Sequence, residues 1–320
     1  MARFVMEFER PLAELEEKLI ALKALDIATT PELAAEIADL EREVERLRVT
    51  LYSALSPWEK VQVSRHPERP KTDDYVRGLF DDVVELRGDR AHADDQSMFT
   101  ALATLAGRRV MVIGHNKGHS TKENVARNFG SPHPEGFRKA ERAMRLAGRF
   151  GLPVVTFLDT AGASPGLEDE ERGQAWAIAR CLETLAGLPV PVVVAGIGEG
   201  GSGGALAIGF GDRMLMLEHS YYSVISPEMC AVILHKDAAR APESAAALSL
   251  TAADLLRLGI IDEVVPEPLG GAHREPDTVI AEVGLRIAAA LDALAGDDRA
   301  DLVERRYQRL RAIGVYNEAG

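Results

Sequence analysis

A glycine-rich run behind an apolar segment is the feature that most restricts how this chain can fold. Residues 190–194 read Val-Pro-Val-Val-Val, which is apolar and mostly β-branched and therefore predicts a buried strand. Residues 196–209 come next, and the second half of this run is compatible with a helix. The pattern predicts a strand, a glycine turn and a helix whose first amides lack intrahelical partners. Because glycine has no Cβ, a ligand can approach such amides closely, so the turn is a candidate site for an anion or a developing oxyanion.

One interpretation of the run is a dinucleotide-binding turn. Gly198, Gly200 and Gly203 match the pattern G-x-G-x-x-G, and Glu218 stands at about the distance of the ribose-binding acid. The helical segment after the glycines, residues 205–208, is short for a nucleotide-binding unit. The spacing alone leaves this interpretation open.

Other interpretations use the same run differently. Ser202 lies in a G-x-S-x-G pattern, with Asp262 and His273 downstream in the order of a serine hydrolase. The surrounding glycines make that pattern nearly automatic, and no H-G-G motif precedes it. A third interpretation is an amide site in which Gly203 and Gly204 donate backbone N–H groups to an oxyanion. A fourth is a glycine turn that serves packing alone.

Composition narrows the class of protein. The chain has 320 residues, 46% of them hydrophobic, which suffices for one large domain or two modest ones. A net charge of -13 argues against broad binding to nucleic acid or to membrane surfaces. Cys181 and Cys230 are the only cysteines, so neither a disulfide framework nor a thiolate metal site is expected. Residues 1–10 are too charged for a signal peptide, and we expect a cytoplasmic protein.

Residues 7–55 carry two helical stripes of apolar side chains. The spacing predicts a helical hairpin, which either closes on itself or offers its apolar seam to a partner. The predicted division of the chain is an N-terminal hairpin for interaction or assembly (1–56), linker helices (57–97) and a larger domain (98–320). The stripes consist of Leu12, Leu15, Leu19 and Leu22, and of Leu33, Ile37, Leu40, Val44, Leu47 and Leu51.

The larger domain alternates predicted strands and helices. A second glycine turn, residues 159–166, comes after the strand predicted at 153–158. Ligands of open α/β sheets bind at the carboxyl ends of strands, so the two glycine turns are expected to wall one pocket. The further strands are predicted at 99–105, 109–114, 213–217, 222–225 and 260–265, and the helices at 137–150, 168–185, 251–258, 277–294 and 301–313, with another beginning at Ser226 and Pro227.

Several motifs together resemble a known family, the carboxyltransferase α subunit of bacterial acetyl-CoA carboxylase. The resemblance begins with the glycine run at 198–209 and covers nearly the whole chain. The other matching segments, in chain order, are Gly88-Asp89-Arg90-Ala91, Ile113-Gly114-His115, Asn128-Phe129-Gly130, and residues 134–140, 170–174, 223–228, 266–274 and 305–310.

This resemblance implies an α/β, crotonase-like spiral of ββα units with an N-terminal helical hairpin and C-terminal helices. It implies an α2β2 heterotetramer in which a separate β subunit carries a four-cysteine zinc ribbon, with no metal on this chain. The implied reaction moves a carboxyl group from carboxybiotin to acetyl-CoA and forms malonyl-CoA, the first committed step of fatty acid biosynthesis. The biotin is covalently attached to a biotin carboxyl carrier protein, and biotin carboxylase is a further partner.

The resemblance also implies roles for residues of the two glycine turns. Gly203 and Gly204 match the backbone oxyanion hole for carboxybiotin, which needs no ionisable side chain. No general base is expected on this chain, because the freed biotin nitrogen can take the substrate proton. The expected substrate-binding residues are Gly162, Ala163, Gly200, Gly201 and Ser202.

The chain departs from the family pattern at four positions. Ala161 stands where the family usually has proline, Ser164 where it has an aromatic residue, and Met229 where it has glycine. His119 stands where arginine is expected. These departures leave two alternatives open: a carboxyltransferase for another acyl-CoA, or a non-catalytic scaffold subunit with a decayed pocket.

Two sets of charged residues have no role assigned by the pattern. Glu199, inside the glycine run, is expected either to orient amides or to be exposed. A basic stretch is expected either to meet CoA phosphates or the carrier protein, or to form a solvated face. Its members are Lys117, Lys122, Arg127, Arg138 and Lys139.

Overall fold

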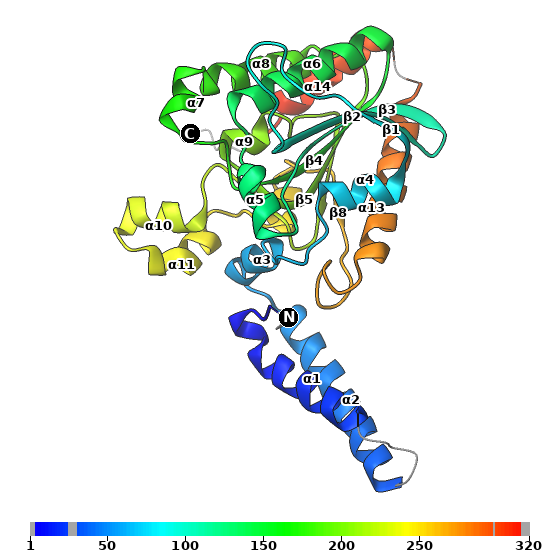
Figure 1. The fold of residues 1–320 in the computed structure, drawn as a ribbon, viewed down its shortest axis with the longest axis vertical. Helices are drawn as coiled ribbons and strands as arrows, with labels where there is room; N and C mark the ends of the chain where they lie inside the picture. Colours follow the sequence, from blue (N-terminus) through cyan, green and yellow to red (C-terminus); the bar gives the residue numbers. More distant parts are fainter. Residues whose placement is uncertain (1–3, 25–30, 297, 315–320) are drawn as a thin grey trace, which may run out of the picture.

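The structure is a computed structural model that describes residues 4–24, 31–296 and 298–314. An α/β body carries a helical hairpin that projects from one end (Figure 1). Within the described ranges, no helix combines the length and the apolar character that crossing a membrane requires.

One mixed sheet forms the centre of the body, in the strand order β1-β2-β3-β4-β5-β6-β8. Strands β1, β2 and β3 pair antiparallel, and β3 to β8 pair parallel along this order. β7 lies off this path and pairs with the end of β5. The strands are β1 (Phe80–Glu85), β2 (Met98–Leu105), β3 (Arg108–His115), β4 (Val154–Thr160), β5 (Val192–Gly201), β6 (Arg213–Leu217), β7 (Tyr221–Ser223) and β8 (Glu263–Val265).

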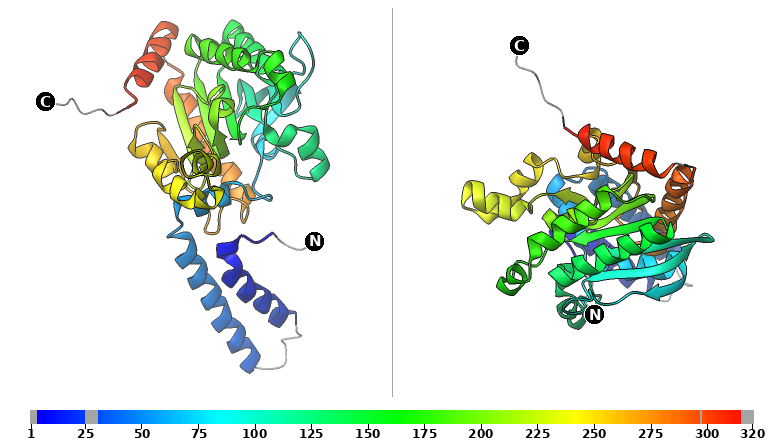
Figure 2. Two further views of the ribbon diagram at one scale, coloured as in Figure 1. Left: turned by 90° about the vertical axis from the view of Figure 1, so that its left-hand side faces the viewer. Right: turned by 90° about the horizontal axis from the view of Figure 1, so that it is seen from above.

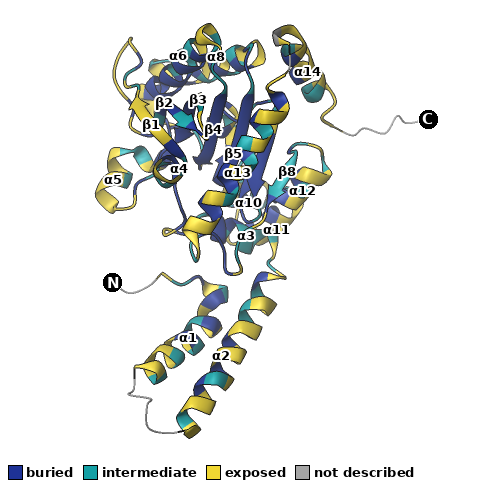
Figure 3. Cartoon of the chain, turned by 90° about the vertical axis from the view of Figure 1, so that its right-hand side faces the viewer, coloured by how far each residue is buried: buried dark blue, intermediate teal, exposed yellow. Residues whose placement is uncertain are grey.

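Helices cover both faces of this sheet, and each face has its own core (Figures 1 and 3). Along β4, Val154 and Leu158 belong to one core while Val155 and Phe157 belong to the other, as the alternation of a strand requires. The first core includes α6 and α8, and the second includes α4 and α13. The helices of the body are α3 (Pro57–Ser64), α4 (Thr72–Leu79), α5 (Thr121–Ala126), α6 (Pro134–Phe150), α7 (Leu167–Glu171), α8 (Gln174–Ala186), α9 (Ser202–Leu206), α10 (Pro227–His235), α11 (Ala241–Ala247), α12 (Ala252–Arg257), α13 (Pro276–Leu294) and α14 (Arg299–Arg311).

The hairpin consists of α1 (Arg10–Lys23) and α2 (Pro31–Tyr52), which lie side by side (Figure 2). The predicted stripes meet between the two helices, where Leu12, Leu40 and Val44 are buried. The pair therefore closes on itself. At its base, Arg274 of the body lies 2.9 Å from Glu16 of α1, which ties the hairpin to the body.

The region predicted as linker helices, residues 57–97, is corrected by the structure. It contains helices α3 and α4, but also β1, which forms one edge of the sheet. The sequence of β1, Phe-Asp-Asp-Val-Val-Glu, does not alternate cleanly between apolar and polar residues. The pairing of β1 with β2 is also irregular between Asp81 and Val84. Asp82 has a φ of 51°, which breaks the extended backbone there.

Two further predictions need correction. The single helix predicted at 168–185 is two helices, α7 and α8, because Gly173 between them has a φ of 81° and interrupts the helical backbone. The final strand predicted at 260–265 is limited to Glu263–Val265. The strands predicted at 99–105 and 109–114 are confirmed as the hairpin β2–β3: Ala106 and Gly107 between them both have positive φ, as its two-residue turn requires.

Candidate active site

The glycine run of the sequence begins as strand rather than as turn. β5 extends through Gly201, so Gly196, Gly198 and Gly200 lie within the strand and the predicted turn starts later. The chain reverses at Ser202, which has a φ of 52°, and the short helix α9 begins there. Neighbouring atoms occupy the space of a side chain at these glycines: a Cβ on Gly198 would overlap Asp159 Oδ1, and one on Gly200 would lie 2.9 Å from the carbonyl oxygen of Tyr221.

The two glycine turns are in direct backbone contact. A Cβ on Gly201 would overlap the carbonyl oxygen of Ala161. A Cβ on Gly204 would lie 2.5 Å from the amide nitrogen of Ala163 and 2.6 Å from the carbonyl carbon of Gly162. Only glycine fits at 201 and 204, because the 161–163 backbone occupies the space of a side chain. The expected meeting of the two turns is confirmed.

Gly203 differs from its neighbours. A Cβ on Gly203 would meet only the side chain of Ile178, at 3.6 Å, which is an ordinary van der Waals distance. Gly203 is also partly exposed, whereas Gly204 is buried. Packing therefore explains glycine at 201 and 204 but not at 203, where the missing side chain leaves the backbone open to a ligand.

A buried histidine supports the carbonyl side of this turn. Nε2 of His115 lies 3.1 Å from the carbonyl oxygen of Gly204, and the amide of Asp159 donates to Nδ1 at 3.4 Å. Nε2 is therefore the donor and Nδ1 the acceptor, which defines a neutral ring. Burial lowers the pKa of His115 to about 3, so the ring stays neutral at physiological pH.

A group of buried charges lies under the two turns. Lys117 Nζ donates to Asp159 Oδ1 and to Glu199 Oε2, both at 2.7 Å. Arg65 Nε donates to Glu199 Oε1 at 2.7 Å, and the hydroxyl of Tyr221 donates to the same oxygen at 3.0 Å. Glu199 is thus buried and paired, which excludes the exposed position that the sequence left open.

These charges line one wall of a cavity at the carboxyl ends of the strands. The cavity has a volume of about 320 Å³ and also borders the first residue of the 161–163 turn. Carboxyl ends of parallel strands are the usual ligand-binding edge of such sheets. The lining residues that bear on the site are Arg65, Lys71, Lys117, Asp159, Ala161 and Glu199.

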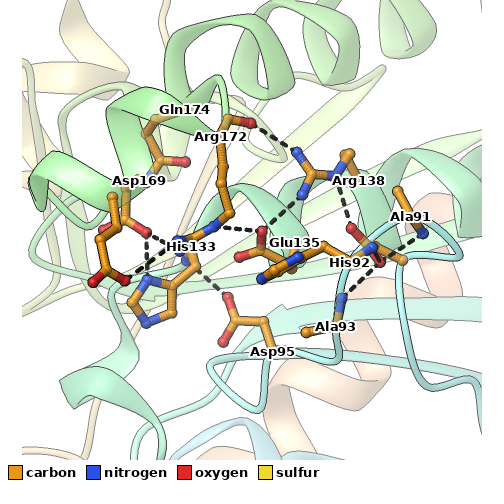
Figure 4. A network of polar contacts seen from close by, with 12 residues as sticks. Ala91, His92, Ala93, Asp95, His133, Glu135, Arg138, Asp169, Arg172 and Gln174 are labelled. Atoms are coloured by element: carbon orange, nitrogen blue, oxygen red, sulfur yellow. Dashed lines mark hydrogen bonds and ion pairs between the residues drawn. The ribbon is translucent and has the colours of Figure 1, made fainter.

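A second polar network holds the rest of the 159–166 turn (Figure 4). Asp169 is its centre: it accepts hydrogen bonds from the hydroxyl of Ser164 and from His133 Nδ1, the latter at 2.7 Å. Arg172 joins Asp169 to Glu135 at 2.9 Å each, and Arg138 continues the network from Glu135. Ser164, one of the departures from the family pattern, is therefore an ordered and bonded member of the turn.

The serine-hydrolase interpretation is not supported by this geometry. Among the described residues, no hydrogen bond connects Ser202 with Asp262 or His273. Asp262 accepts from the amide of Met214 at 2.6 Å and is paired with Arg309. The ring of His273 instead stacks on another histidine, with the centroids 3.7 Å apart. A nucleophilic serine needs an adjacent base, and neither predicted partner serves as one.

The dinucleotide interpretation fails for a different reason. Gly198 and Gly200 lie inside β5, and α9 spans only Ser202–Leu206, too short for the helix of a nucleotide-binding unit. Glu218 accepts from the amide of Glu267 at 3.2 Å and takes part in a strand-end turn. Packing accounts for Gly201 and Gly204, and an amide site remains as the interpretation for Gly203.

The family is decided by comparison with known proteins. A family model described as acetyl co-enzyme A carboxylase carboxyltransferase-like matches residues 5–314. The chain belongs to this family.

Curated members of the carboxyltransferase family support the assignment over the full length. The acetyl-coenzyme A carboxylase carboxyl transferase subunit alpha of Thermus thermophilus is 51% identical over 98% of this chain and 99% of its own length. The subunit of the same name from Sorangium cellulosum is 52% identical, with 99% of each chain covered.

Solved structures agree on the fold. Transcarboxylase 12S superposes with a TM-score of 0.58 at 20% identity, covering 71% of this chain and 42% of that one. The Pseudomonas malonate decarboxylase MdcD-MdcE hetero-dimer gives a TM-score of 0.56 at 20% identity, covering 68% of this chain and 89% of the matched chain. The expected crotonase-like α/β fold is confirmed.

The basic stretch of the sequence is largely internal in this carboxyltransferase-like fold. Arg127 pairs with Asp73, Arg138 with Asp89 and Lys139 with Asp94, each within 2.8 Å. Neither interpretation offered by the sequence describes these pairs, which join segments far apart in the chain. The sequence also assigned no role to His115, although the segment 113–115 was part of the family resemblance.

Proposed function

We propose that this chain is the α component of a biotin-dependent acetyl-CoA carboxyltransferase. It transfers the carboxyl group of carboxybiotin, carried by the biotin carboxyl carrier protein, to acetyl-CoA and so forms malonyl-CoA for fatty acid biosynthesis. The observation that carries the proposal is the open backbone of Gly203 beside glycines that packing alone requires. Membership of the carboxyltransferase family supplies the reaction.

The proposed role of the turn is to stabilise negative charge. Charge builds on the urea oxygen of biotin as its carboxyl group leaves, and the amides of Gly203 and Gly204 donate hydrogen bonds to that oxygen. Fixed amides need no reorganisation during the reaction, and loss of one such donor typically costs about 3 kcal/mol of transition-state stabilisation. The contact of 161–163 with Gly204 and the bond from His115 to the Gly204 carbonyl keep this backbone in place.

The remaining residues of the turns are proposed to bind substrate. Ser202 is exposed at the chain reversal, and Gly162 and Ala163 are partly exposed beside it. Gly200 and Gly201 are the last two residues of β5 and directly precede Ser202. The proton removed from acetyl-CoA goes to the freed biotin nitrogen, so the site works without a side-chain base.

The proposed assembly divides the work among several chains. A β subunit with a zinc ribbon completes the site in an α2β2 heterotetramer, and biotin carboxylase reloads the biotin. The biotin stays covalently bound to the carrier protein. We propose a cytoplasmic complex in which the hairpin of residues 1–56 contributes to assembly and residues 98–320 carry the carboxyltransferase chemistry.

Two of the departures from the family pattern, Ser164 and Met229, take part in local hydrogen bonds. Ser164 is held by Asp169, and Gln174 Nε2 donates to the Ser164 carbonyl at 2.9 Å. Met229 lies in the first turn of α10, where its amide donates to the capping hydroxyl of Ser226 at 3.3 Å. These contacts favour a working pocket over a decayed one.

The test is the reverse half-reaction, decarboxylation of malonyl-CoA with free biotin as acceptor. This chain is assayed alone and then mixed with a zinc-bearing β subunit of the family. We expect activity only in the mixture. Intact complex formation without activity would favour the scaffold alternative, and activity of this chain alone would contradict the proposed division of the site.

A further inference from the structure

Strand β5 changes its pairing with both neighbouring strands at one place. On one side, Leu158 of β4 pairs with Gly196 and Thr160 pairs with Gly200, so β5 uses four residues where β4 uses two. On the other side, β5 pairs with β6 before this point and with β7 after it. Residues 197–199 therefore form a bulge of two extra residues, a feature that bends a strand and changes the direction of the chain beyond it.

Four charged side chains contact this bulge. Lys117 Nζ, on the loop after β3, bridges Asp159 of β4 and Glu199 of the bulge at 2.7 Å each. The amide of Glu199 donates to Asp159 Oδ1 at 3.1 Å, and the carbonyl oxygen of Ile197 accepts from Arg69 Nε at 2.8 Å. In the bulge, the amide of Glu199 and the carbonyl oxygen of Ile197 thus form hydrogen bonds with charged side chains instead of with a neighbouring strand. We call Lys117, Asp159 and Glu199 the charge lock.

The charge lock is buried, and Glu199 within it stays ionised at neutral pH. The side chains of Lys117, Asp159 and Glu199 are 15%, 7% and 9% exposed. Burial alone would raise the pKa of Glu199, but Lys117 and Arg65 outweigh it and lower this pKa to about 2. A buried charge that loses its partner is strongly unfavourable, so the three groups constrain one another's positions.

The bulge decides which residues face the 161–163 turn. With it, Gly201 lies against Ala161, whose carbonyl oxygen leaves no room for a Cβ. If β5 kept the pairing it has at Gly196, Glu199 would stand opposite Ala161 instead. The two extra residues therefore bring glycines, rather than a glutamate, into backbone contact with the neighbouring turn.

We propose that Lys117 is a positioning residue that, through Asp159 and Glu199, sets this bulge and thereby orients the open amide of Gly203. The inference rests on the proposed function of that amide. Lys117 touches no reacting atom in this scheme and acts only through the backbone of β5.

The test uses the variant Lys117→Met combined with Glu199→Gln, assayed in the complex with the β subunit. The double change removes one positive and one negative charge, so the net charge of the group is preserved. We expect kcat for malonyl-CoA decarboxylation to fall by about 100-fold, since small misplacements of catalytic groups have effects of this size. KM for malonyl-CoA is expected to stay constant, and amides of residues 200–204 to exchange hydrogen faster.

The matched control is a buried ion pair near the first residue of β5, at the opposite end of that strand from the bulge. Arg306 pairs with Asp212 at 2.7 Å, with exposures of 0% and 5%, and Asp212 accepts from the amide of Val192, the first residue of β5. The variant Arg306→Met combined with Asp212→Asn removes a buried pair that contacts the start of β5 and, like the test variant, preserves the net charge. We expect a comparable loss of stability with kcat unchanged.

The possible results distinguish a positioning role of Lys117 from a general effect on stability, and both from a failure of the proposed function. Unchanged kcat and unchanged exchange at 200–204 in the Lys117 variant would overturn the proposal. So would equal losses of kcat in both double variants, because the effect would then depend on stability alone. If the unaltered complex shows no decarboxylation, the proposed function fails, while hydrogen exchange at 200–204 still decides whether Lys117 sets the bulge.

Discussion

Most ion pairs within the N-terminal hairpin are exposed, whereas those at the strand ends of the body are buried. The exception in the hairpin is the buried Glu16, which pairs with Arg48 and with Arg274 of the body. In the hairpin, Lys18 and Glu36 pair at 3.8 Å while 60% and 54% of their side chains stay exposed. At the strand ends, Arg69 and Glu267 pair with exposures of 3% and 0%, and Glu199 is held by Lys117 at similar depth. The hairpin is largely yellow, the colour of exposed residues, in the burial view, whereas the central strands β4 and β5 are dark blue (Figure 3).

This difference shows that the two regions depend on their charges to different degrees. Exposed pairs contribute little, because water and salt screen them, so the hairpin depends on its apolar seam. Buried pairs are costly to break and restrict geometry, so the strand ends depend on them for the placement of the glycine turns. Four measurements can break or sharpen this contrast.

The largest expected effect is the response of the strand ends to acid. Burial alone would raise the pKa of Glu267, but Arg69 outweighs it and lowers this pKa to about 2; Glu199 has a similar value. A lowered folded-state pKa stabilises the fold above the unfolded value of 4.5, and that contribution is lost as the pH falls from 4.5 towards 2. The loss amounts to about 3 kcal/mol for each carboxylate.

Urea unfolding between about pH 7 and pH 3 measures this loss. The variant Glu199→Gln is expected to show a shallower pH dependence than the unaltered chain, because one of the two groups is gone. The hairpin variant Glu36→Gln is the control and should leave the slope unchanged. A slope that is the same in all three proteins would contradict the distinction between buried and exposed pairs.

The second prediction concerns the open glycine. In Gly203→Val the side chain crowds the approach to the amide without meeting backbone atoms, since only Ile178 lies near. We expect the rate of malonyl-CoA decarboxylation by the reconstituted complex to fall by about 100-fold, the typical effect of losing one oxyanion donor. Complex formation and the thermal midpoint should change little; full activity would remove Gly203 from the site.

The third prediction concerns the glycine that packing requires. Gly204→Ala forces a Cβ to within 2.5 Å of the Ala163 amide nitrogen, so the free energy of unfolding should fall by about 1–3 kcal/mol. The matched variant Gly203→Ala has room for its methyl group in a helical position, where alanine is favoured by about 1 kcal/mol. Urea unfolding of the two variants should therefore differ in sign, and equal effects would refute the packing argument.

The smallest expected effect belongs to the hairpin. Lys18→Met removes an exposed pair, so the free energy of unfolding should change by no more than about 0.5 kcal/mol. A loss as large as that of Gly204→Ala would mean that exposed charges stabilise the hairpin, and the contrast between the two regions would fail.

The sequence predicted the N-terminal hairpin more completely than the strand ends of the body. The spacing of Leu12, Leu40 and Val44 predicts the hairpin because helix periodicity is local. The family motifs predict the glycine turns, and the strand order brings them together. The strand β1 and the helices α5 and α11 escaped prediction, since their segments are short and show no clear period.

The charge lock could not be read from the sequence. Lys117, Asp159 and Glu199 are separated by some 40 residues each, and their pairing depends on the parallel register of β3, β4 and β5. No local pattern distinguishes a lysine on a solvated face from one buried between two carboxylates. The solvated face was therefore the wrong interpretation for Lys117.

Residue types and local periodicity, which a chain displays before it folds, were enough to indicate the family, the N-terminal helical hairpin and the glycine turns that contain residues 201, 203 and 204. They could not show that 201 and 204 must be glycine for packing while 203 is open. That distinction depends on which backbone lies opposite each residue, and it exists only in the folded chain. The two-residue bulge of β5 makes this choice, and buried charges from three separate segments hold it.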